Sequence, residues 1–228
     1  MTLSLCLLTY NEIDGCRIDV PQLPLHQFDQ VYAVDGGSTD GTIAYLGSHG
    51  IAVHLQPKPG YNQAYVCAFE HCTTDALIVF HPKGSVDPGA VAKFRPLFER
   101  GFDLVIASRM IRGGRNEEDE KVLRPRKWFV LGLGLLAGLI WRRKGPLMWD
   151  VLHGFRGMRR DRFAAIEPLQ CGLSMDLEMV VRCYRKEYKA IEFPVVERFR
   201  PNAKTHFKAI PTGIQLLRYL VFELTRSS

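Results

Sequence analysis

Short apolar runs alternate with stretches of helical length along the first hundred residues of the chain. Residues 3–8 form a continuous apolar run, a pattern typical of a strand buried on both faces of a sheet. Four further apolar runs predict strands at residues 31–34, 52–55, 76–80 and 104–107. The segments between them that have helical length and spacing are residues 42–48, 63–71 and 88–100. This alternation predicts βαβ units, and therefore an α/β fold with a largely parallel central sheet flanked by helices.

The middle of the chain holds an apolar stretch, residues 128–141, with a tryptophan at each end. A helix of that length covers about 21 Å, whereas the hydrocarbon core of a bilayer is roughly 30 Å thick, so we do not expect it to span a membrane. Basic residues precede it at 124–127 and follow it at 142–144. Such flanks are typical of a helix in a membrane interface, but a buried helix of the fold is an equally good interpretation.

The last third of the chain predicts a helix at residues 176–188, a strand at 191–196 and a terminal helix. From residue 212 onward, five apolar side chains share one helical face: Ile214, Leu217, Leu220, Val221 and Leu224. Three roles are open for that face: it caps the core, it pairs with another subunit or it rests on lipid. We expect a single domain at residues 1–208, with a nucleotide-binding half (1–108) and an acceptor half (109–208). A C-terminal amphipathic helix at 209–228 follows it.

The composition is that of a globular protein, and the cysteines indicate its cellular compartment. Of the 228 residues, 46% are apolar and 24% are charged, proportions that exclude long disorder. The six cysteines are scattered and form no CxxC pair, which predicts reduced, mostly buried thiols in a cytosolic compartment. The first residues lack a basic stretch, so we expect no secretory signal.

The net charge of +6 favours an acidic partner. Basic side chains crowd residues 109–127, 142–144, 156–162 and 182–208. No zinc-finger spacing, RNA-binding aromatic motif or basic zipper accompanies them, so we expect no nucleic-acid partner. A basic enzyme that works near phosphates or at a membrane surface fits this pattern.

Polar motifs follow the apolar runs where the predicted strands end. They are Thr9-Tyr10-Asn11-Glu12, Asp35-Gly36-Gly37-Ser38, His81-Pro82-Lys83 and Ser108-Arg109. Because ligands sit beyond the carboxyl ends of parallel strands, we expect these motifs to form one site. Asp35 can accept hydrogen bonds from a nucleobase or a ribose, and glycine at position 36 lets the backbone approach a ligand closely. Arg109 is costly to place in an apolar strand end without an anion, which favours a phosphate contact.

Taken in order, these motifs resemble those of the family-2 glycosyltransferases of GT-A fold. The most similar branch is the polyprenyl-phosphate sugar transferases, which include the dolichol-phosphate mannose synthases. The first two motifs match the opening segments of that family. Further similar segments lie at residues 59–64, 107–114, 150–156, 175–178 and 192–200.

The resemblance implies a nucleotide-sugar donor with its diphosphate facing the end of the fourth strand. The residues that it assigns to the nucleotide are Thr9, Tyr10, Glu12, Asp35, Gly36 and Gly60. Transfer in this family inverts the anomeric centre by direct displacement. Asp176 is assigned as a catalytic base or as an acceptor-binding group.

The acceptor is expected at the basic second half of the chain. Its candidate binding residues are Arg124, Arg126, His153, Arg156 and Arg200. In the polyprenyl-phosphate branch the acceptor phosphate is itself the nucleophile, whereas a sugar hydroxyl would need a base. The alternatives are a simple basic flank for the first two arginines, a packed loop residue for His153 and an exposed charge for Arg200.

The chain departs from the family at the metal site. Where the family places an Asp-X-Asp triplet that holds a divalent cation, the aligned residues are His81-Pro82-Lys83. Proline and lysine cannot replace carboxylate oxygens as ligands of Mg²⁺ or Mn²⁺, so we predict no metal site and no cofactor. In one interpretation Lys83, helped by Arg109, stabilises the leaving diphosphate in place of the metal. In the other interpretation catalysis is lost and the fold only binds.

The sequence thus predicts a transferase that moves a sugar from a nucleotide donor to a polyprenyl phosphate or a glycan. We expect it in the cytoplasm, peripherally attached to the inner face of the membrane, and we leave a homo-oligomer open. The rival hypothesis is an inactive binding or regulatory protein of a glycan-assembly complex, whose cleft would be filled by its own side chains. Nucleotidyl transfer is a third hypothesis, disfavoured because that chemistry relies on metal-binding carboxylates.

Overall fold

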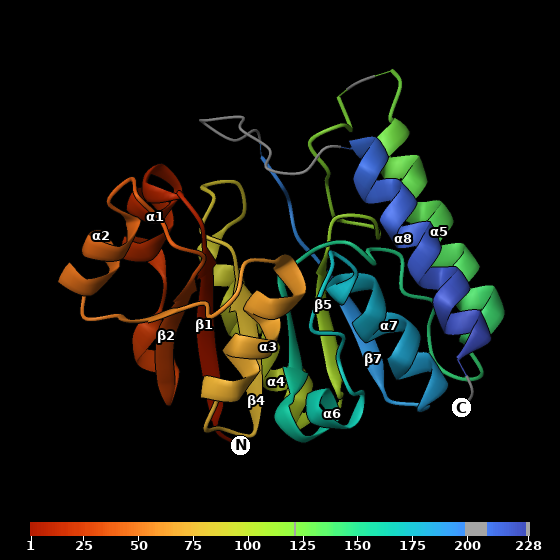
Figure 1. Ribbon diagram of the computed structural model, residues 1–228, viewed down its shortest axis with the longest axis horizontal. Coiled ribbons are helices and arrows are strands. Elements are labelled where there is room, and N and C mark those ends of the chain that lie inside the picture. The colour runs from red at the N-terminus through yellow and green to blue at the C-terminus, as the bar shows by residue number, and fades with distance from the viewer. Residues whose placement is uncertain (121, 199–208, 227–228) are drawn as a thin grey trace.

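The computed structural model describes residues 1–120, 122–198 and 209–226 (Figure 1). The strands are β1 (Leu3–Thr9), β2 (Gln30–Asp35), β3 (Ala52–Leu55), β4 (Ala76–Phe80), β5 (Leu104–Ser108), β6 (Arg156–Arg159) and β7 (Ala190–Pro194). The α-helices are α1 (Ile13–Asp19), α2 (Thr42–Ser48), α3 (Tyr61–His71), α4 (Phe94–Glu99), α5 (Pro125–Trp141), α6 (Arg160–Ala165), α7 (Met175–Arg185) and α8 (Ala209–Thr225). Short 3-10 helices lie at η1 (Val20–Gln22), η2 (Leu25–Gln27) and η3 (Pro88–Lys93).

Within the described residues, the strands form one seven-stranded sheet in the order β3-β2-β1-β4-β6-β5-β7. β6 pairs antiparallel with β4 and β5, and the other neighbouring strands pair in parallel. The register sets Thr9 beside Asp35 and Leu7 beside Phe80, so β1, β2 and β4 end at the same edge. That edge is at the top of Figure 1. The predicted α/β fold with a largely parallel sheet is confirmed.

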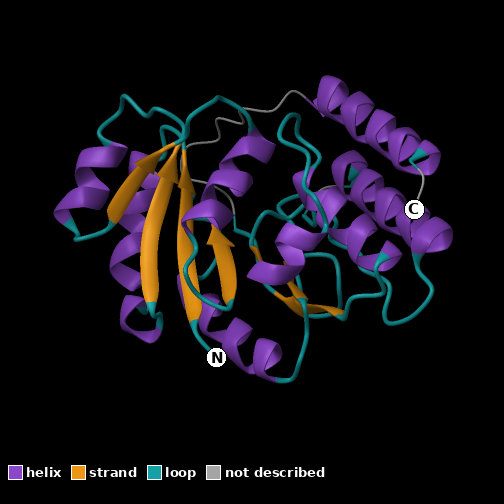
Figure 2. Cartoon of the chain, turned by 60° about the horizontal axis from the view of Figure 1, so that its bottom comes forward, coloured by secondary structure: helices purple, strands orange, loops and turns teal. Residues whose placement is uncertain are grey.

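Apolar side chains leave the sheet toward both faces, because successive residues of a strand point in opposite directions. In β1, Leu5 and Leu7 pack with α1, α2 and α4, while Cys6 and Leu8 pack with α3 and α7 on the other face. Figure 2 shows helices on both sides of the strands. The continuous apolar run of β1 thus reflects a strand that meets water on neither face.

Two regions differ from the sequence-based prediction. Residues 88–100, expected as one helix, form η3 and then α4. Pro96 has no N–H to donate, so a helix that begins anew at Phe94 places it in the first turn, where no partner is needed. The pattern predicts no strand at Arg156–Arg159. These residues form β6, which lies between β4 and β5 and pairs with both of them. Gly157 there lies so close that an added Cβ would be 3.0 Å from the carbonyl oxygen of Leu77.

The apolar stretch at residues 128–141 lies within α5, and one side of this helix is buried. Val130, Leu133 and Ala137 face the core, whereas Trp128 and Leu139 are 55% and 74% exposed. The buried-helix interpretation is therefore confirmed for the inner side, and an apolar outer side stays exposed. Among the described residues, no helix combines the length and the apolar character that crossing a bilayer requires.

α8 lies beside α5 and runs parallel to it (Figure 1). Gly213 packs against the ring of Phe129 near the start of both helices, and Leu224 lines the same pocket as Ile140 near their ends. α8 caps the core with Leu216, Tyr219 and Leu220. Of the five apolar residues expected to share one face, only Leu220 is buried; Ile214, Leu217, Val221 and Leu224 are 45–60% exposed.

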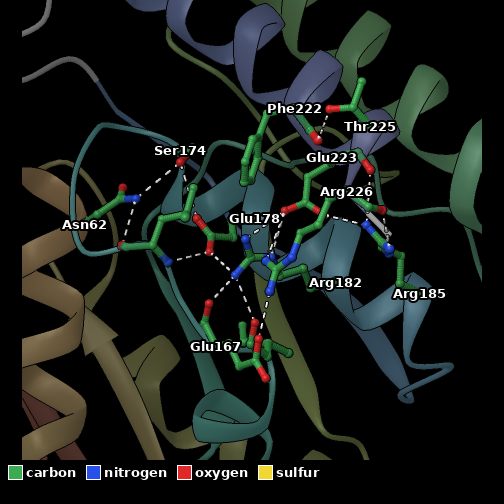
Figure 3. Close-up of polar contacts among 12 residues, drawn as sticks. Asn62, Glu167, Ser174, Glu178, Arg182, Arg185, Phe222, Glu223, Thr225 and Arg226 are labelled. Carbon is green, nitrogen blue, oxygen red and sulfur yellow. Dashed lines mark hydrogen bonds and ion pairs between the residues drawn. The ribbon is translucent and has the colours of Figure 1, made fainter. Parts of the chain in front are cut away.

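A buried network of charges attaches α8 to α7 (Figure 3). Glu223 accepts hydrogen bonds from Nη2 of Arg182 at 2.7 Å and from Nη1 of Arg185 at 2.9 Å. Glu178 pairs with the same Arg182 from the other side. Because Tyr219 and Glu223 both point inward, apolar spacing alone does not identify the buried side of α8.

Candidate active site

A pocket of about 370 Å³ opens at the ends of β1 and β2, where the sequence predicts the nucleotide. Five of the six residues expected to bind the nucleotide line it: Thr9, Tyr10, Glu12, Gly36 and Gly60. Apolar side chains complete the wall: Leu8, Pro59, Ala64 and Leu173. An apolar pocket with a few polar groups suits a flat base carried by a polar sugar.

Tyr10 forms the outer wall of this nucleotide pocket. Its ring is half exposed and lies over Gly36, where an added Cβ would come within 3.1 Å of the ring. Glycine at position 36 therefore leaves room for the Tyr10 ring at the mouth. An aromatic ring in that position can stack on a base.

Asp35, the sixth expected residue, does not line the pocket, which corrects its assignment as a nucleotide contact. Its carboxylate is fully buried. It accepts hydrogen bonds from the Thr9 hydroxyl at 2.6 Å and from the backbone N–H groups of Gly37 at 2.8 Å and Ser38 at 2.6 Å. The Ser38 hydroxyl donates as well, at 2.7 Å. With these four donors, Asp35 shapes the loop after β2 and orients Thr9.

A second pocket, of about 250 Å³, adjoins the first and contains all three residues predicted to be catalytic: Lys83, Arg109 and Asp176. A groove of about 640 Å³ continues from it between α5 and α8. Lys83 lines all three cavities. The turn after β4 is thus the point where the nucleotide pocket, the second pocket and the groove meet.

Arg109 finds its anions within the chain, which corrects the expected phosphate contact. Its Nε and Nη2 each donate to an oxygen of Asp150 at 2.9 Å, and its Nη1 donates to Glu197 at 3.0 Å. Burial alone would raise the pKa of Asp150, but the charge and hydrogen bonds of Arg109 outweigh it and lower that pKa to about 2. Arg109 therefore holds two carboxylates, of which Glu197 lines the second pocket and Asp150 is buried behind it.

Asp176 faces the second pocket from the start of α7, and three groups hold its carboxylate. The hydroxyls of Tyr61 and Tyr65 donate to it at 2.7 and 3.1 Å, and Nε of Arg156 lies 3.1 Å from Oδ1. Burial, with the charge of Asp176, raises the pKa of both tyrosines, so they stay protonated donors. The fold therefore holds the carboxylate in a fixed orientation at the second pocket.

The start of α7 is fixed by Asn62 of α3. Its Oδ1 accepts the N–H of Met175 at 2.9 Å, and its Nδ2 donates to the carbonyl of Cys171 at 3.0 Å and to Ser174 at 3.2 Å. Figure 3 shows Asn62 directed at Ser174. The helix that carries Tyr61 and Tyr65 thus also sets the position of Asp176.

Arg156, expected to bind the acceptor, is fully buried beneath Asp176, and that assignment is corrected. Its Nε donates to the carbonyl of His153 at 2.8 Å and its Nη1 to the carbonyl of Asp176. His153 does line the second pocket, with Nδ1 bonded to the carbonyl of Ala107. Burial, together with the charge of Arg109, lowers the pKa of His153 to about 4, so it is neutral at pH 7.

The groove between α5 and α8 is lined by apolar residues together with basic and acidic ones, among them Lys127 and Glu117. Apolar side chains line it: Met110, Phe129, Val130, Ile214 and Leu217. Arg126, with its side chain 55% exposed, lies in its wall with Lys127. Arg124 pairs with Asp119 at 3.2 Å and is not among the lining residues, and its assignment to the acceptor stays a prediction. Arg200 lies outside the described residues.

The residues after β4 do not fit a divalent cation. Pro82 offers no side-chain donor, and Lys83 brings a positive charge. Asp87 accepts the N–H of Gly89 at 3.0 Å as the cap of η3. In the part of the chain that the structure describes, no three His, Cys, Asp or Glu side chains gather as ligands. Mg²⁺ and Mn²⁺ prefer several oxygen ligands, which the residues after β4 do not supply.

Sequence reasoning missed the partners that order this site. Tyr61 and Tyr65 stand one helical turn apart, which signals a shared face but not what that face meets. Asp150 and Glu197 lie 41 and 88 residues from Arg109 along the chain. Only the sheet brings those carboxylates to the end of β5.

Comparison with known proteins agrees with this architecture. Residues 4–166 match the family described as Glycosyl transferase family 2. The chain is 25% identical over 208 residues to glycosyltransferase AglJ of Haloferax volcanii, a match that covers 87% of this chain and 64% of AglJ. It is 26% identical over 203 residues to polyprenol monophosphomannose synthase of Mycolicibacterium smegmatis, covering 82% of this chain and 74% of the synthase. The chain thus spans just under two thirds of AglJ.

A solved structure shares the fold over the whole chain. Glucosyl-3-phosphoglycerate synthase from Mycobacterium tuberculosis, in complex with Mn²⁺, uridine diphosphate and phosphoglyceric acid, aligns with a TM-score of 0.74 at 17% identity. The alignment covers 100% of this chain and 80% of the synthase. Likeness at this identity shows the fold alone, and it confirms the expected GT-A-like arrangement.

Proposed function

The chain belongs to glycosyl transferase family 2, and we propose that it transfers a sugar from a nucleotide-sugar donor to a polyprenyl phosphate, without a metal held after β4. The observation that carries this proposal is the meeting of three cavities at Lys83. The nucleotide pocket suits the donor nucleoside, and the second pocket suits the reacting sugar and phosphates. The apolar groove suits the chain of a lipid.

The proposed transfer is a single inverting displacement. An oxygen of the acceptor phosphate forms a bond to the anomeric carbon while the bond from that carbon to the donor diphosphate breaks. The electron pair leaves with the nucleoside diphosphate, and the ammonium of Lys83 stabilises the negative charge that develops there. A phosphate oxygen is already deprotonated at neutral pH, so no proton has to move.

The state of Asp176 supports a phosphate acceptor over a glycan hydroxyl. A hydroxyl nucleophile needs a general base with a free lone pair directed at it. Tyr61, Tyr65 and Arg156 contact both oxygens of the Asp176 carboxylate from within the fold. Burial lowers the pKa of His153 to about 4, which makes its ring a weak base at neutral pH. An acceptor that arrives ionised requires neither residue to remove a proton.

Replacing Asp176 by asparagine distinguishes the two acceptor classes. With polyprenyl phosphate in detergent micelles as acceptor, we expect transfer by Asp176→Asn to fall by less than about tenfold, because no general base is removed. Initial rates with radiolabelled nucleotide sugars, measured for wild type and variant, provide the test. A loss of about 10²- to 10⁴-fold, the usual contribution of a general base, would argue for a hydroxyl acceptor.

The open cavities also support an enzyme over an inactive binding protein. A binding-only relative is expected to fill the cleft with its own side chains, yet the nucleotide pocket and the second pocket keep about 370 and 250 Å³. If purified protein binds nucleoside diphosphates but transfers no sugar to any phosphate or glycan acceptor, the binding role replaces the transferase.

We also propose that the outer side of α5 and α8 contacts an anionic bilayer, at the inner face of the membrane. Five large apolar side chains on these two parallel helices are 44–78% exposed: Trp128, Leu135, Leu139, Ile210 and Val221. The basic run at 142–144 follows α5, as at many membrane interfaces. All six cysteines are free thiols, which suits the reducing side of a membrane.

Removing apolar area from this surface is expected to release the protein from lipid. We expect Leu139→Ser with Val221→Ser to reduce flotation with phosphatidylglycerol vesicles about tenfold or more, since burying each side chain contributes about 1.5–3 kcal/mol. Leu55→Ser is the matched control, because Leu55 is 64% exposed but lies on β3 at the far edge of the sheet. Equal flotation of both variants would remove the membrane proposal. High salt should weaken wild-type binding.

A further inference from the structure

The turn that carries Lys83 rests directly on α1. An added Cβ at Gly15 would lie 2.1 Å from the carbonyl oxygen of Pro82 and 2.7 Å from Cα of Lys83, so only glycine permits this approach. On the other side of the lysine, an added Cβ at Gly84 would lie 2.9 Å from Cδ1 of Ile18. The backbone of the turn thus contacts α1 on both sides of Lys83.

Asp19, the last residue of α1, adds a charged hydrogen bond to this contact. Its Oδ2 accepts the N–H of Gly84 at 2.8 Å, and the backbone of Lys83 also stabilises the carboxylate. Asp19 is 1% exposed and lines none of the three cavities of the site. Its charge therefore faces the turn and not a ligand.

We propose that Asp19 is the positioning residue of the Lys83 turn, holding the lysine ammonium at the point where the three cavities meet. Hydrogen bonds to an ionised carboxylate are about twice as strong as neutral ones, so the anchor depends on the Asp19 charge. α1 begins directly after Glu12, which lines the nucleotide pocket. One short helix thereby ties the nucleoside end of the donor site to its diphosphate end. This inference rests on the proposed function, since it needs Lys83 to meet a diphosphate.

The titration of Asp19 gives the proposal a distinctive signature. Burial raises the pKa of Asp19 from 3.8 to about 6, opposed by the backbone bonds from Gly84 and Lys83, and the charge of Glu12 adds to the rise. The ionisable groups around it are Glu12, directly before α1, Cys16 on α1 and Lys83 on the turn. Burial raises the pKa of the Cys16 thiol to about 12, which leaves it neutral.

Stability and donor affinity are therefore expected to move in opposite directions with pH. Because the pKa of Asp19 is higher in the folded than in the unfolded chain, the stability linked to its proton is fully present below pH 3.8 and is lost as pH rises through 6. The loop anchor behaves in the opposite way, since it is strongest with Asp19 ionised. If Asp19 only stabilised the fold, folding stability and nucleotide affinity would not move in opposite directions with pH.

Calorimetric titration of UDP and GDP into the full chain tests this, using whichever nucleotide binds more tightly. From about pH 7 to pH 5 we expect wild-type affinity to fall about tenfold. Asp19→Asn should bind about tenfold more weakly at pH 7, with little further change at pH 5. The matched control is Asp14→Asn on the exposed side of the same helix, which should follow wild type. The melting temperature of Asp19→Asn at pH 7 should equal or exceed that of wild type.

The outcomes separate this inference from the proposed function. Wild-type affinity in Asp19→Asn, or an unchanged pH profile, would overturn the role of Asp19. A loss of affinity that only parallels a lower melting temperature would do the same. Lys83→Ala tests the proposed function separately. If that variant keeps wild-type nucleotide binding and sugar transfer, the proposed function itself fails.

Discussion

Lys83→Ala is expected to reduce sugar transfer by about 10²- to 10³-fold, the range observed when a preorganised group that stabilises developing charge is removed. Lys83 is the residue that lines the nucleotide pocket, the second pocket and the groove. The resemblance of the sequence motifs places it where the family is expected to carry metal-binding carboxylates. In the proposed transfer, the Lys83 ammonium lies beside the diphosphate that gains charge as it leaves. We expect kcat to fall more than donor affinity, because the interaction strengthens in the transition state.

Initial-rate kinetics in the presence and absence of EDTA provide the measurement. Lys58→Ala is the matched control, since Lys58 is exposed on the loop before Gly60 and does not line the nucleotide pocket. Transfer by wild type should survive EDTA, and Lys58→Ala should retain it. Activity that disappears with EDTA and returns with Mn²⁺ would refute the substitution of the metal by Lys83.

Arg109→Met is expected to destabilise the protein by about 3–5 kcal/mol, because it leaves buried carboxylates without their cation. The side chain of Asp150 is 0% exposed, that of Glu197 is 4% exposed, and both bond to Arg109. Since Arg109 lowers the pKa of Asp150 to about 2, the stability from this pair is present above pH 3.8 and is lost as pH falls toward 2. The variant should lack this contribution.

Urea unfolding at neutral pH measures the loss. The control is Arg95→Met, which breaks an exposed pair with Asp29 and should destabilise the protein much less than Arg109→Met. A small change for Arg109→Met, combined with lost nucleotide binding, would restore the phosphate contact that the sequence suggested. Partial recovery in Arg109→Met with Asp150→Asn would confirm that the uncompensated carboxylate causes the instability.

The strand-end motifs show how far sequence reasoning reaches at this site. Thr9, Glu12 and Lys83 follow apolar runs that belong to parallel strands, and parallel strands end at one edge. Their convergence on one set of cavities was therefore predictable from local pattern. Of the residues expected to bind the nucleotide, those on the loop surface, such as Tyr10 and Gly60, line the pocket, and their binding of a nucleotide stays a prediction.

The errors share one cause, which is that a charge does not reveal its partner along the chain. Asp35 and Arg156 carry the chemistry expected of ligand contacts, yet both are fully buried. Asp35 accepts hydrogen bonds from the loop after β2, and Arg156 donates through Nε and Nη1 to backbone carbonyls. Arg109 was expected to need an anion, and it has one, 41 residues away in Asp150. A buried charge needs a partner, but its neighbours in the sequence do not identify that partner.

The pattern of apolar and polar residues by itself determined most of the strands and the edge of the sheet where the polar motifs meet. It could do so because an apolar run and the turn that ends it depend on residues close together in the sequence. It also predicted that Lys83 stands in place of a metal ligand, which the Lys83→Ala and EDTA experiments test. The tertiary structure decided which charges face a ligand and which face each other. It set β6 between β4 and β5, brought Tyr61 to Asp176, and turned Glu223 of α8 toward Arg182. Those contacts join distant segments, and the free energy of burying a charge depends on what the whole fold places beside it.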